Sequence, residues 1–133
     1  MEIIKTPPPS HIYDRCVEQF GVDFNQGVIF TYGDNIYTKN DLPDHLIIHE
    51  STHIKQQKSY GKEIWWEKYF TDEKFRYEQE LEAYRKQYQF FTKTNKDRNR
   101  RDKFLTIIAG DLSGSMYGNI IEHSEAKKVI KQK

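Results

Sequence analysis

Residues 40–61 read NDLPDHLIIHESTHIKQQKSYG, and this stretch carries the clearest structural signals in the chain. A capping side chain ahead of Pro43, the proline itself and the acidic Asp44 are together typical of a helix start. Gly61 is typical of a helix end. The stretch therefore predicts a helix from about residue 43 to Tyr60.

The middle of this predicted helix, residues 49–53, reads HESTH and matches the pattern HExxH. A spacing of four residues places His49 and His53 one turn apart on the same helix face. Two imidazoles in that arrangement can bind one tetrahedral zinc ion, and the glutamate between them can reach a water molecule at the metal. The pattern therefore predicts a zinc site on His49 and His53, with Glu50 beside it.

A second interpretation is that His49 and His53 are ordinary polar residues on an exposed helix face. The neighbouring side chains favour burial instead, because the pair is flanked by Leu46, Ile47, Ile48 and Ile54. His45 lies one further turn back, too far along the helix axis to share the same ion. We expect it near the helix start or behind the two ligands.

A catalytic zinc site of this kind needs a third protein ligand. The extended metzincin pattern requires glycine at position 56 and histidine at position 59, but the chain has Gln56 and Ser59, so that class is excluded. The remaining common solution is a carboxylate from a later helix. A helix capped by Thr71 and running to about Thr92 is predicted, because no Gly or Pro interrupts it.

The orientation of this later helix selects among its glutamates. Its apolar stripe is formed by Tyr77, Leu81, Tyr84, Tyr88 and Phe91. Glu80 lies about 60° from the centre of the stripe, whereas Glu78 and Glu82 lie about 100° and 140° away and should face solvent. Glu73 already has an explanation in the first helical turn. Glu80 is therefore the predicted third ligand.

Shorter signals describe the other segments. Residues 1–10 contain Pro7-Pro8-Pro9 and predict an extended entry, residues 10–27 are ambiguous, and residues 28–38 predict a hairpin around Gly33-Asp34. A short aromatic helix is expected over residues 64–70. Residues 93–103 predict a solvated loop or a helix start. A loop is expected around Gly110, Gly114 and Gly118, and Ser124 is expected to cap a final helix that runs through Ile130.

Length and composition agree with one mostly helical α+β domain spanning residues 1–133. The 133 residues carry a formal net charge of +1, so no overall field attracts the chain to nucleic acid or to anionic membranes. No apolar run reaches the roughly 20 residues that a membrane span needs, and the start of the chain does not resemble a signal peptide. We therefore expect a cytoplasmic protein. Cys16 is the only cysteine, which excludes disulfide scaffolds and cysteine-based zinc sites.

The segment from Leu46 to Tyr84 resembles the minimal gluzincin metallopeptidases, in which an HExxH helix is followed by a helix with the pattern E-x-E-A-[DY]. Here residues 78–84 read EQELEAY, and the second pattern lies at residues 80–84. Over residues 28–121 the chain is also similar to small HExxH proteins of bacteria and their phages. The resemblance implies a zincin-like fold, with the hairpin packed beside the HExxH helix and Glu80 as zinc ligand.

The resemblance also implies a mechanism. Zinc on His49, His53 and Glu80 would keep a fourth position for water, and Glu50 would act as general base on that water during hydrolysis of a peptide or protein substrate. Tyr117 and Tyr84 are candidates for stabilising the transition state. An extended substrate would pair with an edge strand of the hairpin.

One position departs from the better-studied peptidases. Tyr84 stands where they have an aspartate that orients a zinc-bound histidine. Asp34, Asp72 and Asp111 are the candidates to replace it.

Two alternative functions remain at this point. One is a zinc-binding protein that is not catalytic. The other is a nucleic-acid-binding or virion-associated structural protein, based on the basic residues between Lys93 and Lys103 and the C-terminal Lys127, Lys128, Lys131 and Lys133. Because these basic tracts have no interleaved aromatic residues, nucleic acid is not the expected partner.

Overall fold

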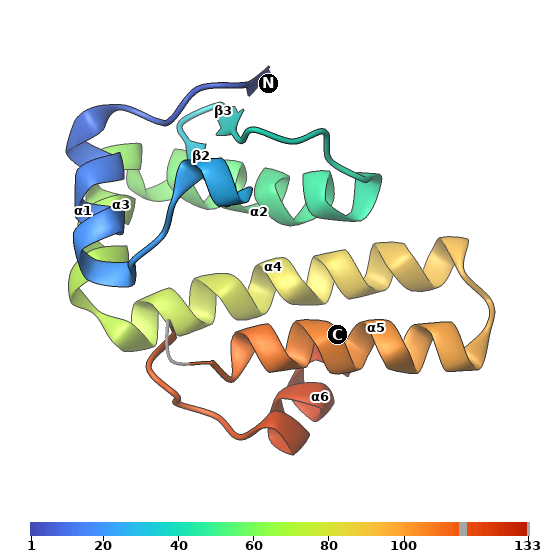
Figure 1. Cartoon of the computed structure of the whole chain (residues 1–133). Coiled ribbons are helices and arrows are strands. Elements are labelled where there is room, and N and C mark those ends of the chain that lie inside the picture. Colours follow the sequence, from blue (N-terminus) through green and yellow to red (C-terminus); the bar gives the residue numbers. More distant parts are fainter. Residues whose placement is uncertain (115–116, 133) are drawn as a thin grey trace.

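The protein is an α+β domain, mostly helical, with a small three-stranded sheet (Figure 1). The computed structural model describes residues 1–114 and 117–132. The elements in chain order are β1 (Ile3–Ile4), α1 (Ser10–Phe20), a 3₁₀ turn (Phe24–Gln26), β2 (Phe30–Tyr32), β3 (Asn35–Tyr37), α2 (Asp44–Tyr60), α3 (Lys62–Thr71), α4 (Glu73–Thr94), α5 (Arg98–Leu112) and α6 (His123–Lys131).

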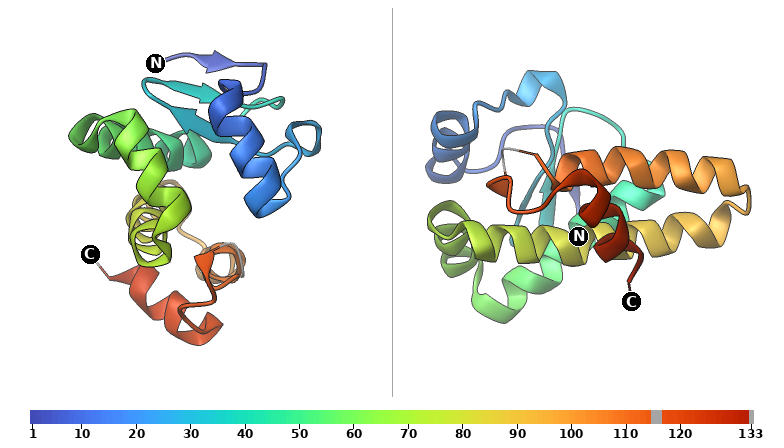
Figure 2. Two further views of the ribbon diagram at one scale, coloured as in Figure 1. Left: turned by 90° about the vertical axis from the view of Figure 1, so that its left-hand side faces the viewer. Right: turned by 90° about the horizontal axis from the view of Figure 1, so that it is seen from below.

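The long helix α4 lies at the centre of the molecule. It packs against α2 on one side and against α5 and α6 on the other. Figure 2 shows the sheet beyond α2, so that the order from one end to the other is sheet, α2 with α3, α4, and then α5 with α6. The buried residues of α4 are Phe75, Arg76, Glu80, Ala83, Tyr84 and Gln87.

The sheet has the order β1-β3-β2. β2 and β3 form the predicted hairpin, and Gly33 turns the chain with a φ of +61°, a value that glycine adopts easily. The N-terminal segment is extended as predicted, and it adds a parallel strand, with Ile3 paired to Ile36. β2 therefore lies at an edge of the sheet, next to α2.

The hairpin is attached to α2 by polar contacts. The Gln57 side chain accepts a hydrogen bond from the Gly33 backbone N–H (2.7 Å) and donates one to the Thr31 carbonyl (2.8 Å). The Trp66 indole of α3 donates to the same carbonyl (3.0 Å). These contacts hold β2 alongside the HExxH residues.

The boundaries of α2 and α4 agree closely with the predicted ones, but the predicted side-chain caps are wrong. α2 begins at Asp44 behind Pro43 with no side-chain cap, so the capping side chain expected ahead of Pro43 is not found. α4 is capped by Asp72, which accepts from the Phe75 N–H (3.1 Å), and not by Thr71, which ends α3.

The C-terminal third also differs in detail from the prediction. α5 begins at Arg98, in agreement with a helix start, but it continues through Gly110 to Leu112, so the predicted loop begins later. α6 starts at His123 with Glu122 at its N-cap, two residues before the predicted cap Ser124. The ambiguous residues 10–27 form α1, whose Ile12 and Cys16 are buried one turn apart.

Within the described residues, no helix is both long and apolar enough to cross a membrane.

Candidate metal centre

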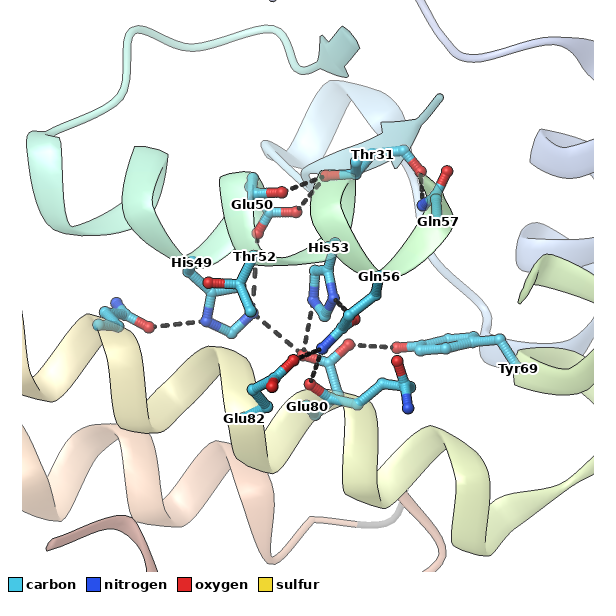
Figure 3. Close-up of polar contacts among 12 residues, drawn as sticks. Thr31, His49, Glu50, Thr52, His53, Gln56, Gln57, Tyr69, Glu80 and Glu82 are labelled. Atoms are coloured by element: carbon cyan, nitrogen blue, oxygen red, sulfur yellow. Dashed lines mark hydrogen bonds and ion pairs between the residues drawn. The ribbon is translucent and has the colours of Figure 1, made fainter. Parts of the chain in front are cut away.

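Helices α2 and α4 bring the three predicted ligands together (Figure 3). The Nε2 atoms of His49 and His53 lie 3.0 and 3.2 Å from the same oxygen, Oε1 of Glu80. All three side chains are buried. The prediction that Glu80, rather than another glutamate of α4, turns inward is therefore confirmed by its position.

The donor atoms fit a tetrahedral cation. Bond lengths of about 2.0–2.2 Å to a zinc ion place neighbouring ligand atoms about 3.3–3.5 Å apart, close to the distances found here. The Nδ1 of His49 faces the amide oxygen of Gln87 (2.8 Å), and the Nδ1 of His53 faces that of Gln56 (2.8 Å). Because an amide oxygen only accepts, each Nδ1 carries the proton and donates it. If a metal ion displaced the protons at Nε2, each histidine would be neutral and its Nε2 lone pair would point at the position that Glu80 also faces.

The charges at this point favour a cation. Burial alone would lower the pKa of His53, but the Glu80 carboxylate beside it outweighs burial and raises that pKa to about 9. Burial opposes the charge on Glu80, yet the two histidines hold its pKa well below the usual range. Tyr69 donates a further hydrogen bond to Glu80 Oε2 (2.6 Å). Glu80 is therefore a buried anion with positive charge beside it.

Glu50 lies next to this group and is also buried. Its Oε1 accepts a hydrogen bond from the Thr31 hydroxyl on β2 (3.0 Å), while its Oε2 lies 3.8 Å from His49 Nε2. Burial raises the pKa of Glu50. One carboxylate oxygen is thus fixed by the hairpin, and the other faces the histidines.

A cavity of about 230 Å³ adjoins these residues. His49, Glu50, His53 and Glu80 line one part of it. The rest is mostly apolar and comes from α1, the β2 region, α3, α4 and α5, as Phe20, Phe30, Trp65, Trp66 and Ile108 show. The candidate ligands therefore open onto a space that a second molecule can enter.

Both candidate tyrosines, Tyr84 and Tyr117, line this cavity. Their hydroxyls share a hydrogen bond, and burial raises both pKa values well above the usual 10. The Tyr84 ring also packs edge-on against His49, with 4.6 Å between centroids. At neutral pH both hydroxyls keep their protons and can donate hydrogen bonds.

None of the three predicted aspartates orients the two histidines. Asp34 pairs with Lys58, and Asp72 caps α4. Asp111 lines the cavity, where burial raises its pKa, but it is not the group that His49 contacts. The amide side chains of Gln87 and Gln56 accept from the two histidines instead.

The contacts extend beyond these two amides. The Gln87 amide nitrogen donates to Nδ1 of His45 (3.0 Å). His45 therefore lies behind the ligands, which is one of its two predicted positions. The Gln56 amide nitrogen donates to Glu82 (2.7 Å). Glu82 is exposed, as predicted, but its carboxylate also accepts a hydrogen bond that holds Gln56 in place. Glu73 and Glu78 are exposed.

Sequence reasoning missed Gln56, Gln87, Tyr69 and Thr31. Two of them carry a periodic signal: Gln56 follows His53 by three residues, and Gln87 follows Glu80 by seven, so each lies on the same helix face as its neighbour in the site. Tyr69 and Thr31 come from other elements. No spacing within one helix could identify them.

The basic segment is partly engaged within the fold. The Arg101 guanidinium donates to the carbonyls of Thr92 and Asn95 (both 2.6 Å), and Lys127 pairs with Asp102. These contacts give the two cations a role in joining α4, α5 and α6.

Comparison of the chain with protein-family models, with curated proteins and with solved structures gives no match. The case for a function therefore comes from the geometry of the site itself.

Proposed function

We propose that the protein is a zinc-dependent metallopeptidase with a zincin-like fold. The observation that carries this proposal is the convergence of His49 Nε2, His53 Nε2 and Glu80 Oε1 on one point, beside a second buried carboxylate and a cavity. A site with zinc alone would not need Glu50 to be buried next to the ligands. A hydrolytic site would, because it requires a proton acceptor there.

The chain supplies a specific group for each step. When bound, zinc lowers the pKa of a water molecule and polarises a carbonyl oxygen. Oε2 of Glu50 is the atom placed to take the proton from the attacking water, since Oε1 is engaged by Thr31. The same carboxyl group then delivers that proton to the leaving amine.

Tyr84 and Tyr117 have a second role in this proposal. Their raised pKa values keep both phenols protonated, and since one hydroxyl donates to the other, the second can donate its proton to the negative oxygen that develops during attack. The peptide backbone would lie along β2, whose outer edge carries no strand within the described part of the sheet.

The first test is the metal itself. Purified protein should contain one zinc ion per chain, because three buried donors already face one point and two amides hold the histidines from behind. Elemental analysis measures this stoichiometry directly, and His49→Ala should lose the metal. Protein refolded in excess zinc that still contains almost none would contradict the proposal.

The second test is hydrolysis. Zinc-loaded protein should cleave members of a fluorescence-quenched peptide library, and a chelator should stop cleavage until zinc is restored. Zinc at one equivalent without cleavage of any peptide or protein substrate would instead favour a non-catalytic zinc protein.

A further prediction concerns Gln87. Gln87→Leu leaves the Nδ1–H of His49 buried without its acceptor, so zinc affinity should fall about 10- to 100-fold, as it does when supporting groups of metal ligands are removed. Gln87→Glu keeps an acceptor oxygen and should retain affinity. Competition with a zinc-binding dye measures both, with Gln89→Leu on the same helix as control. Equal affinity in Gln87→Leu and wild type would show that the amide does not support the ligand.

A further inference from the structure

The side chain of Asp111 lines the same cavity as the candidate metal ligands. Asp111 lies in the last turn of α5 and is exposed, so both solvent and a ligand can reach it. It shares this lining with His49 and Tyr84.

The Asp111 carboxylate differs from the other two carboxylates of the cavity. Glu50 is held by Thr31, and Glu80 is held by Tyr69 and the two histidines. Across residues 1–114 and 117–132, neither a hydrogen bond nor an ion pair reaches the Asp111 side chain. A negative group that faces a binding space without an internal partner is available to a ligand.

Besides Asp111, the titratable groups that line the cavity include Glu50, Glu80 and the two histidines that face Glu80. None of the described residues that line it is lysine or arginine, and most of its remaining wall is apolar. A substrate carboxylate, such as a free C-terminus, would find no lysine or arginine there and would approach Asp111. A positively charged group would gain an attractive partner.

We propose that Asp111 is a specificity-determining residue that selects peptides with a positive charge close to the cleaved bond. This inference rests on the proposed peptidase function and names its substrate class. The positive group is either the free N-terminal ammonium or the side chain of lysine or arginine. Both present the same chemistry to the carboxylate, and the experiment separates them.

The test measures binding to zinc-loaded Glu50→Gln protein, in which turnover is blocked. The probes are the acetylated, amidated peptide Ala-Ala-Phe-Leu-Ala-Ala, its form with a free N-terminus, and blocked forms with each alanine replaced in turn by lysine or glutamate. Trp65 and Trp66 both line the cavity and are the only tryptophans, so intrinsic fluorescence reports occupancy.

A positively charged peptide should bind about fivefold more tightly than the neutral one, because one partly exposed ion pair has about this effect. The glutamate forms should bind more weakly than the neutral peptide. A preference for the free N-terminus identifies the ammonium, and a preference at one lysine position identifies the side chain. Asp111→Asn should remove the preference, and Asp111→Lys should reverse it toward the glutamate forms. Asp102→Asn, the same change on the same helix, should preserve it.

Equal dissociation constants for lysine and glutamate forms would overturn the inference, as would a preference that survives Asp111→Asn or the absence of binding by every peptide. Hydrolysis is measured separately on wild-type protein. Charge-selective binding without any hydrolysis would overturn the peptidase proposal alone. Hydrolysis with no charge preference would overturn the role of Asp111 alone.

Discussion

Glu50→Gln is expected to reduce peptide hydrolysis at least about 100-fold while zinc stays bound at one equivalent, since general base catalysis typically contributes 10²- to 10⁴-fold. Glutamine has nearly the shape of glutamate but cannot take a proton from water at neutral pH. The change leaves His49, His53 and Glu80 in place. The loss should therefore appear in kcat and not in metal content.

The contacts of Glu50 indicate that Glu50→Gln removes the proton acceptor without disturbing the fold. The Thr31 hydroxyl donates to one carboxylate oxygen, and the amide oxygen of glutamine can accept the same hydrogen bond. Removing a buried carboxylate also removes the cost of burying its charge, which is the cause of the raised pKa of Glu50. The folded state should thus be as stable as wild type, or more so.

A matched control is Glu78→Gln, which makes the same chemical change at an exposed position on α4. It should leave both zinc content and hydrolysis unchanged. The measurements are elemental analysis, thermal unfolding and the rate of cleavage of one good peptide. Wild-type turnover in Glu50→Gln would mean that another group removes the proton, and the assignment of Glu50 would be wrong.

The sequence predicts the inner part of the site because that part depends on helix geometry alone. The spacing of His49 and His53 decides that they share a face, and the position of Glu80 relative to its apolar stripe decides that it turns inward. Neither statement requires knowledge of how α2 and α4 cross. This is why the three ligands were predictable from local periodicity.

The burial of residues on α4 shows what periodicity within one helix does not predict. Within the predicted stripe, Tyr84 is buried, whereas Tyr77, Leu81 and Tyr88 are only partly buried. The most buried face also includes Glu80, Ala83 and Gln87. The stripe predicts one contact surface, but α4 has neighbours on two sides. Whether Gln87 reaches His49 depends on that packing, which no single helix specifies.

Long-range pairing limits prediction of the sheet in the same way. The Gly33-Asp34 turn is a local signal, and the hairpin follows from it. The parallel pairing of Ile3 with Ile36 joins residues 33 positions apart, so no local pattern marks it. The predicted extended segment was correct, while its partner became visible only in the structure.

Glu80→Ala is expected to weaken zinc binding at least about tenfold, because it removes one of three proposed ligands and a buried negative charge that contacts both histidines. Competition with a dye of known zinc affinity measures this loss. At fixed free zinc, each tenfold loss of affinity lowers the free energy of unfolding by about 1.4 kcal/mol. The stabilisation by zinc should shrink accordingly.

A second loss of stability is independent of zinc. The Tyr69 hydroxyl donates to Glu80, so alanine leaves this buried donor without its acceptor, at a cost of about 1–3 kcal/mol. Thermal unfolding with zinc and with a chelator separates the two effects. Glu80→Gln keeps an oxygen for Tyr69 and should recover most of the zinc-independent part, while zinc binding stays weak.

The neighbouring glutamates then test the helical phase of α4. Glu78→Ala should change neither zinc affinity nor stability, because Glu78 is exposed. Glu82→Ala should have a small effect, since Glu82 holds Gln56, and Gln56 in turn accepts from His53. The expected order of zinc affinity is therefore Glu78→Ala equal to wild type, Glu82→Ala slightly lower and Glu80→Ala lowest. If Glu82→Ala or Glu73→Ala released the metal instead, the face of α4 that meets α2 would have to be reassigned, because residues 80 and 82 lie about 200° apart around a helix.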